Sequence, residues 1–313
     1  MERTPFGSED MQAQAVKTVF NGIANEVGTH TVQLWLVIEN DADKAKPFGS
    51  AILLEANGSH YLLTAAHVLD DIDVSNLAFW DDQDLVQVSG KCVYLSTKAE
   101  INKKADVAIW QLSDDATSAL LKHYTFLPFD RVSQDHQIVE QERYLLLGYP
   151  VSKTKKIYKT MTIPIKSLPL FTRGVINQRK LERNELDGDV NLMVEYHRRK
   201  AQSFGAKKGQ IEHLPDPHGM SGCGLWYIDA DKTLKLVGVM TGYNHTDSVM
   251  IASRIDLVTE VIRLSFDSTL PPSNTIKVHW INQPTVIKQE MTDNKAIPST
   301  DVAADGEYKK INE

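Results

Sequence analysis

Three short segments carry residue types that together perform acyl-transfer chemistry. YLLTAAHV is an apolar run that ends near His67, ADVAIW places Asp106 before an apolar run, and HGMSGCGL places Ser221 between glycines. A serine hydroxyl is a weak nucleophile until a neighbouring base takes its proton. Histidine is a suitable base near neutral pH. A buried Asp106 would hold the imidazole in the correct tautomer and support its positive charge.

The glycines beside Ser221 let the backbone turn tightly, so that N–H groups can converge on a developing oxyanion. Each segment alone is weak evidence for a catalytic site. A histidine at the end of a strand, an aspartate before one and a Gly-x-Ser-Gly loop are each more often structural or turn residues. The prediction of a catalytic set rests on their joint order and context.

The elements that must position these residues are mostly strands. Residues 8–26 have a helical stripe, with Ser8 as a plausible N-cap. The hydrophobic period then shortens to that of strands, and Asn57-Gly58 predicts a tight hairpin. A second strand-rich block starts near residue 136 and has a candidate strand at 156–166, and residues 254–266 return to a helical stripe. Short strands without alternating helices favour antiparallel barrels or sandwiches.

Composition narrows the function class. The 313 residues carry a net charge of −7 and are 42% hydrophobic, which excludes a largely disordered chain. No apolar run reaches the length of about 18 residues that suggests a membrane-spanning helix. The N-terminus lacks a secretory pattern, so we expect a cytoplasmic protein in which Cys92 and Cys223 are reduced. Scattered histidines and cysteines predict no metal and no cofactor.

Taken together, the motifs resemble those of the chymotrypsin/trypsin-like serine peptidases, in particular intracellular, bacterial-type members. TAAHV resembles the family's histidine motif, ADVAIWQL its aspartate strand and HGMSGCGL its serine loop. FGSA at 48–51 resembles the strand before the histidine hairpin, and LVGVMTG at 236–242 the strand that lines the cleft. The order His–Asp–Ser is the one this fold uses. The resemblance covers residues 30–265.

This resemblance implies an all-β fold of two six-stranded antiparallel β-barrels with an N-terminal and a C-terminal helix. The expected units are a helical lead at 1–28, a first barrel with His67 and Asp106 at 29–126, a second barrel with Ser221 and the C-terminal helix at 127–268, and an irregular or disordered tail at 269–313.

The resemblance also implies roles for single residues. His67 is the general base, Asp106 its orienter and Ser221 the nucleophile, and the N–H groups of Gly219 and Ser221 form the oxyanion hole. The residues expected to contact substrate are Asp216, His218, Thr241, Gly242 and Tyr243. A carboxylate at Asp216 would favour lysine or arginine before the scissile bond. If the neighbouring prolines direct it to solvent, a small or apolar preference follows instead, with an acidic one the third option.

Two positions depart from the family pattern. Met220 stands where the digestive members have an acid that pairs with a newly cleaved N-terminus, so activation by N-terminal insertion is not expected. Cys223 replaces a usual glycine. A buried small thiol is the plain interpretation, and a redox-sensitive site beside the nucleophile is the alternative.

The expected function is that of a serine endopeptidase that cleaves protein or peptide substrates through an acyl-enzyme. The resemblance implies control by a regulatory protein partner in a multi-component bacterial system, anti-phage defence among them. The alternative is a catalytically silent module that binds peptides or partners. Residues 150–200 hold 12 Lys/Arg against 5 Asp/Glu, which fits a partner-, anion- or nucleic-acid-binding face or merely solvated loops. No nucleic-acid-binding motif accompanies them, so nucleic acid is not expected as a partner.

Overall fold

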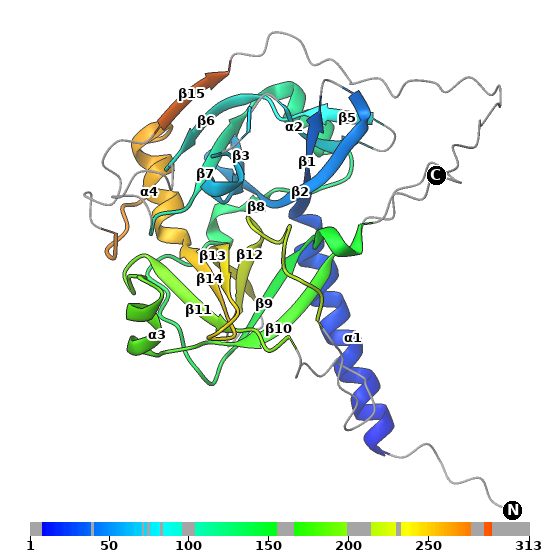
Figure 1. Ribbon diagram of the computed structural model, residues 1–313, viewed down its shortest axis with the longest axis vertical. Coiled ribbons are helices and arrows are strands. Elements are labelled where there is room, and N and C mark those ends of the chain that lie inside the picture. The colour runs from blue at the N-terminus through cyan, green and yellow to red at the C-terminus, as the bar shows by residue number, and fades with distance from the viewer. Residues whose placement is uncertain are drawn as a thin grey trace, which may run out of the picture.

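The computed structural model describes residues 8–38, 41–70, 72–73, 76–81, 84–95, 104–154, 166–198, 214–229, 233–276 and 285–289. Two β-sheets form two lobes, one above the other in Figure 1. The candidate strand at 156–166 lies, except for its last residue, outside the described residues, as do the lysines at 155–159. Among the described helices, none combines the length and apolar character that a membrane span requires.

The upper lobe is a nine-stranded sheet in the order β15-β6-β7-β3-β2-β1-β4-β5, with β8 paired to β2. Its strands are β1 (Thr31–Ile38), β2 (Asp41–Ala56), β3 (Ser59–Thr64), β4 (Leu77–Asp81), β5 (Asp84–Gln87), β6 (Gly90–Tyr94), β7 (Ala108–Leu112), β8 (Leu127–Pro128) and β15 (Thr285–Gln289). The predicted hairpin is present: Asn57 and Gly58 both have positive φ, and Ala56 pairs with Ser59.

This sheet has more strands than the six expected. The two residues of β8 pair with β2 in parallel, the one parallel pairing between described strands. The larger correction concerns the tail, expected to be irregular from residue 269 onwards. Residues 285–289, TVIKQ, form β15 and pair antiparallel with β6. A short segment rich in β-branched residues can pair with the free edge of a sheet. Nothing in the sequence of the segment itself predicts that pairing.

The lower lobe is a six-stranded antiparallel sheet in the order β10-β9-β12-β13-β14-β11. Its strands are β9 (Arg143–Gly148), β10 (Leu168–Arg173), β11 (Asn191–Glu195), β12 (Gly224–Ile228), β13 (Leu234–Asn244) and β14 (Val249–Arg254). A bridge between Gly174 and Val194 connects the two outermost strands, so that the sheet closes on itself as a barrel.

Strands that face both a barrel interior and the other lobe are apolar on both sides. In β3, Leu62 packs inside the first barrel, whereas Tyr61 and Leu63 join the cluster between the lobes. In β9, Leu146 packs inside the second barrel and Leu147 against the first. This double burial explains why these strands appear in the sequence as continuous apolar runs rather than alternating ones.

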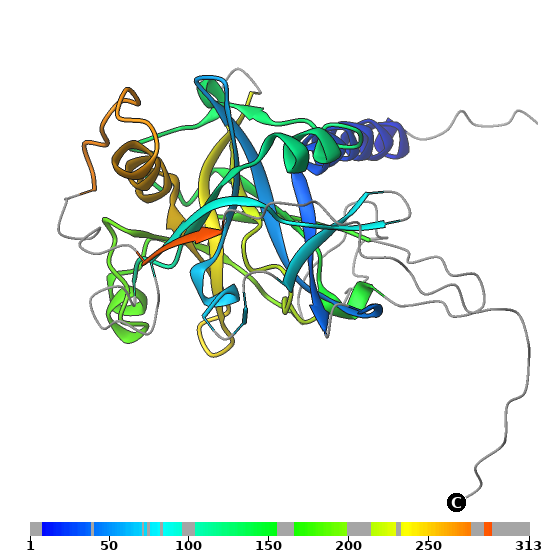
Figure 2. The same cartoon turned by 90° about the horizontal axis from the view of Figure 1, so that it is seen from above.

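The helices lie around the two sheets. Figures 1 and 2 show α1 (Ser8–Thr29) and α4 (Ile255–Ser265) on opposite sides of the molecule. Both were predicted. The short helices α2 (Asp114–Leu120) and α3 (Gln178–Arg183) were not, because each is shorter than the window in which a helical stripe can be detected. Ser113 and Asn177 cap them through their side chains.

Residues 266–276, here named the C-terminal strap, hold α4 against both lobes. The Asn57 amide, at the β2–β3 turn, donates a hydrogen bond of 2.9 Å to Asp267. Lys91 of β6 donates to the carbonyl of Ser265 at 3.0 Å and lies over the ring of Phe266. The contacts tie the first barrel to the end of the helix that follows the second barrel.

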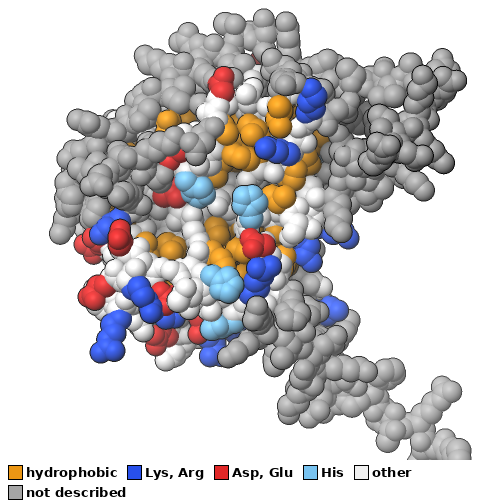
Figure 3. Space-filling view, viewed as in Figure 1, with side chains coloured by type: hydrophobic (Ala, Val, Ile, Leu, Met, Phe, Trp, Pro, Cys, Tyr) orange, Lys and Arg blue, Asp and Glu red, His pale blue; other side chains and the backbone are white. Residues whose placement is uncertain are grey.

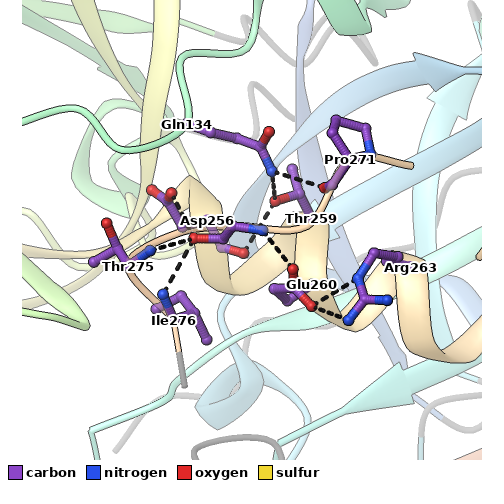
Figure 4. Close-up of polar contacts among 9 residues, drawn as sticks. Gln134, Asp256, Thr259, Glu260, Arg263, Pro271, Thr275 and Ile276 are labelled. Atoms are coloured by element: carbon purple, nitrogen blue, oxygen red, sulfur yellow. Dashed lines mark hydrogen bonds and ion pairs between the residues drawn. The ribbon is translucent and has the colours of Figure 1, made fainter. Parts of the chain in front are cut away.

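Farther along, the strap turns back onto α4 (Figure 4). The Ser273 hydroxyl donates to the buried carboxylate of Asp256 at 3.0 Å, and its N–H donates to Glu260. The side chain of Gln134 bridges Thr259 and the carbonyl of Pro271. Two buried carboxylates of the helix are thereby supplied with donors from the strap.

The first barrel bears His67 and Asp106 and the second bears Ser221, and the strand pairings of both are antiparallel apart from that of β8, as in a chymotrypsin-like double-barrel fold. The fold class predicted from the sequence is confirmed, with the extra strands of the first sheet as the difference.

Candidate active site

His67 lies where the chain leaves β3. Buried Ala65 and Ala66 carry the chain into the 3-10 helix η1 (Ala66–Val68), and this turn directs the His67 side chain outward, 38% exposed. Asp106 lies just before β7, the strand that pairs with β3, so its place in the same sheet brings it beside His67. Ser221 lies in the turn before β12 of the second barrel.

The three side chains form one hydrogen-bonded chain. The Oδ2 atom of Asp106 is 2.7 Å from Nδ1 of His67, and Nε2 of His67 is 3.0 Å from Oγ of Ser221. The other carboxylate oxygen accepts the backbone N–H of His67 at 2.9 Å. With both oxygens engaged, the carboxylate cannot rotate away from the ring. Figure 3 shows histidine side chains gathered in the middle of the face where the lobes meet.

The electrostatics favour His67 as a base that is readily protonated by a serine hydroxyl. Burial lowers the pKa of His67, but the hydrogen bond and charge of Asp106, with a smaller contribution from Asp70, outweigh it, so the pKa lies above its ordinary value. The imidazolium that forms during proton transfer is stabilised by the same contacts. An exchange of a proton between Ser221 and His67 is therefore the chemistry that this arrangement supports.

The serine loop is held by backbone contacts from both barrels. The carbonyl of Ser221 accepts the N–H of Ser50 at 2.9 Å, and the N–H of Gly222 donates to Met240 at 2.7 Å. Gly219 has φ +92°, and a Cβ there would lie 2.7 Å from the carbonyl oxygen of Tyr149. Only glycine fits this conformation and this close approach.

The same contacts fix the two N–H groups expected to bind an oxyanion. In a trans peptide the N–H points opposite to the preceding carbonyl. The His218 carbonyl accepts from Val151 at 2.9 Å, and the Met220 carbonyl accepts from Cys223 at 3.0 Å. The N–H groups of Gly219 and Ser221 are thus directed away from these anchors. In the described part of the chain, neither of them has a backbone acceptor.

The predicted cleft wall is the end of β13. Pairing of β13 with β12 ends at Val239, whereas pairing with β14 continues to Asn244. Residues 241–243 therefore keep one side of their backbone available next to the serine loop, as an added substrate strand requires. A bulge lies at Thr241, and the ring of Tyr243 packs edge-on against Tyr196 at 5.0 Å.

Asp216 does not have a free carboxylate. Arg198 donates to its Oδ2 at 3.1 Å, and the N–H of His218 donates to its Oδ1 at 3.1 Å. Both charged side chains are substantially exposed, at 38% for Arg198 and 56% for Asp216. The neighbouring Pro215 carbonyl accepts the Tyr196 hydroxyl at 2.7 Å. Sequence reasoning missed Arg198, because nothing in the sequence spacing links it to this loop.

Both departures from the family pattern are buried. Met220 is fully buried in the apolar interior of the second barrel, and its side chain has no charge with which to pair an N-terminus. Cys223 is also fully buried, and burial raises the pKa of its thiol, as it does that of Cys92. Both cysteines are free thiols in the structure. These observations favour the interpretation of Cys223 as a packing residue.

No family model matches the chain, and no curated protein matches it. Among solved structures, the chain is similar to a thermostable serine protease from an extremophilic microorganism, at 13% identity over 79% of this chain and 100% of that chain, with a TM-score of 0.47. It is also similar to an inactivated protease paralogue of the scabies mite, at 14% identity over 79% of this chain and 96% of that chain, with a TM-score of 0.48.

Proposed function

We propose that this protein is a serine endopeptidase. The observation that carries the proposal is the unbroken hydrogen-bonded chain from Asp106 through His67 to Ser221, with both ring nitrogens of the histidine engaged. A histidine that orients toward a serine at one nitrogen and a carboxylate at the other is the arrangement that activates a hydroxyl nucleophile.

In the proposed reaction, Oγ of Ser221 attacks the carbonyl carbon of a peptide bond while Nε2 of His67 takes the hydroxyl proton. The carbonyl oxygen becomes an oxyanion that accepts the N–H groups of Gly219 and Ser221. His67 then gives its proton to the leaving amine as the carbon–nitrogen bond breaks. Water attacks the resulting ester, with His67 again the base, and releases the acid and the free serine.

The substrate would lie extended along residues 241–243 and pair with their backbone. We infer that a regulatory partner, in a multi-component system in the cytoplasm, controls access to this edge. Assembly of the catalytic side chains would need no partner, because His67 and Ser221 are already within 3.0 Å. A partner that is an activator would then change KM or loop geometry rather than create the hydrogen-bonded chain.

Labelling by a fluorophosphonate probe tests the proposal against a silent binding module. We expect the unaltered protein to be labelled at Ser221 and Ser221→Ala to show no labelling. Peptide turnover in that variant should fall by about 10⁴-fold or more. Ser133→Ala, which changes a half-buried serine away from the site, serves as the matched control and should label normally. An unaltered, folded protein that resists the probe would favour the silent module.

A further inference from the structure

Ser50 is a buried hydroxyl that connects the two barrels at the serine loop. It belongs to β2 of the first barrel and is fully buried. Its hydroxyl donates a hydrogen bond of 2.8 Å to the carbonyl of Gly219 and accepts the N–H of Tyr149 at 3.0 Å. Its backbone N–H donates to the carbonyl of Ser221 at 2.9 Å. One residue of the first barrel thus contacts the loop on both sides of Met220.

The surrounding glycines show how closely the segments approach at this point. A Cβ on Gly148 would lie 3.2 Å from the Ser50 hydroxyl oxygen and 2.9 Å from the Cβ of Cys223. A Cβ on Gly222 would collide with the carbonyl of Ser50 and the side chain of Thr64. Three backbones therefore meet around a site that a serine side chain fills, and its hydroxyl is a donor to one of them and an acceptor for another.

The contact with Gly219 bears on the geometry of the oxyanion hole. Glycine has no Cβ to restrict φ and ψ, so the orientation of Gly219 depends on what holds the peptide groups on either side of it. Val151 holds the preceding peptide through the His218 carbonyl, at 2.9 Å. The Ser50 hydroxyl holds the following peptide through the Gly219 carbonyl itself. Without that donor the buried carbonyl of Gly219 would be unpaired, which would favour rotation of the peptide group toward another donor.

We propose that Ser50 is a positioning residue for the oxyanion hole: its hydroxyl fixes the Gly219 carbonyl, which limits rotation about the backbone bonds of Gly219 and so helps the Val151 contact to keep the Gly219 N–H toward the oxyanion. The inference rests on the proposed peptidase function. Ser50 itself touches no reacting atom. Its effect should therefore appear in the stabilisation of the transition state and leave the binding of the ground-state substrate nearly unchanged.

The test compares Ser50→Ala with Ser89→Ala in the full-length protein. Ser89 is another buried serine of the first barrel, whose hydroxyl bonds Ser113 at 2.6 Å, away from the catalytic side chains. Loss of an oxyanion donor itself costs about 10²- to 10³-fold in kcat. For Ser50→Ala, which only loosens such a donor, we expect a fall of about 10- to 100-fold, with KM changed by less than about threefold.

A transition-state probe separates positioning from a general loss of stability. A peptide aldehyde, which forms a tetrahedral adduct with the serine, should bind Ser50→Ala more weakly by the same factor as the fall in kcat. The corresponding peptide carboxylic acid, a product that forms no such adduct, should bind both proteins equally. If Ser50→Ala does not fold, Ser50→Cys replaces the hydroxyl with a weaker donor and should show the same pattern with a smaller fall.

Several results would overturn the inference. An unchanged kcat and unchanged aldehyde affinity in Ser50→Ala, or an equal fall in kcat in Ser89→Ala, would each reduce Ser50 to a packing residue. These results leave the proposed function intact, since the unaltered protein would still hydrolyse peptides. Absence of fluorophosphonate labelling in the unaltered protein would instead overturn the proposed function, and this inference with it.

Discussion

Replacing Asp106 by asparagine tests the catalytic geometry without changing its shape. The carboxylate accepts two hydrogen bonds from the same residue, the backbone N–H of His67 at 2.9 Å and its Nδ1–H at 2.7 Å. Asparagine has only one acceptor oxygen. If this oxygen keeps the backbone N–H, the NH₂ group faces Nδ1, which must then accept. The ring proton moves to Nε2, and His67 can no longer take a proton from Ser221.

The size of the effect follows from those two hydrogen bonds. Restoring the active tautomer would leave the NH₂ group facing the backbone N–H, at a cost of about 1–3 kcal/mol for an unpaired buried group. Loss of the charge-assisted hydrogen bond to the imidazolium costs about 1.5–3 kcal/mol more. Since a tenfold change in rate corresponds to about 1.4 kcal/mol, kcat should fall by about 10²- to 10⁴-fold.

The pH profile gives a second readout of the same substitution. The activity requires neutral His67, so kcat/KM rises as pH passes the pKa of His67. The hydrogen bond and charge of Asp106 raise that pKa against the effect of burial. In Asp106→Asn the contribution of burial remains without this opposition, so the acid limb of the profile should move to lower pH. In Asp70→Asn, a variant that removes the smaller contribution of the Asp70 charge, the limb should move slightly in the same direction while kcat stays within about threefold.

The assay measures the hydrolysis rate of fluorogenic peptides from pH 4 to 9. Circular dichroism checks that each variant stays folded over this range. The reasoning is refuted if folded Asp106→Asn keeps kcat within tenfold of the unaltered protein, or if its acid limb moves to higher pH.

Three further predictions follow from the site and its surroundings. Asp216→Ser should leave the preference for the residue before the scissile bond unchanged in a peptide-library profile, because Arg198 and the His218 N–H already engage the carboxylate. Arg198→Gln should move the preference toward lysine and arginine. A strong change of preference in Asp216→Ser alone would contradict the assignment of the carboxylate to these two partners. Both thiols should resist iodoacetamide in the folded protein and react after denaturation, because burial raises the pKa of Cys92 and Cys223. Intact-mass analysis measures the labelling. Rapid labelling of Cys223 under native conditions would instead favour a redox-sensitive site. Gly219→Ala should lower the rate of fluorophosphonate labelling by tenfold or more, because its Cβ would lie 2.7 Å from the Tyr149 carbonyl oxygen. Gly58→Ala, also at positive φ but with open space around its Cβ, should label at the normal rate. Equal labelling rates in the two variants would count against the loop geometry.

The sequence predicted the fold class and the three residues that the structure brings together. His67, Asp106 and Ser221 each stand beside an apolar strand or a glycine turn, and such local patterns survive in the sequence because short-range rules produce them. The hairpin at Asn57-Gly58 is similarly local. The catalytic roles remain predictions until the variants above are measured.

What the sequence did not predict depends on contacts between distant segments. Ser50 and Gly219 are bonded across 169 positions, and Arg198 donates to Asp216 across 18 positions, a pairing that no periodicity of the sequence indicates. The strand β15 pairs with β6, and a segment of five residues cannot by itself indicate that partner. Such pairings are decided by the tertiary fold, which overrides local propensity.

The C-terminal strap has a consequence for how activity appears as the protein is made. The strap joins the Asn57 turn to residues that follow Ser221 in the chain. Because synthesis proceeds from the N-terminus, a nascent chain contains His67, Asp106 and Ser221 before it contains this additional connection between the barrels. We expect a ribosome-bound chain that stops before residue 266 to have both catalytic halves but a poorly defined distance between them. Synthesis of the strap would then be the step after which the two halves can reach the separation that the folded protein shows.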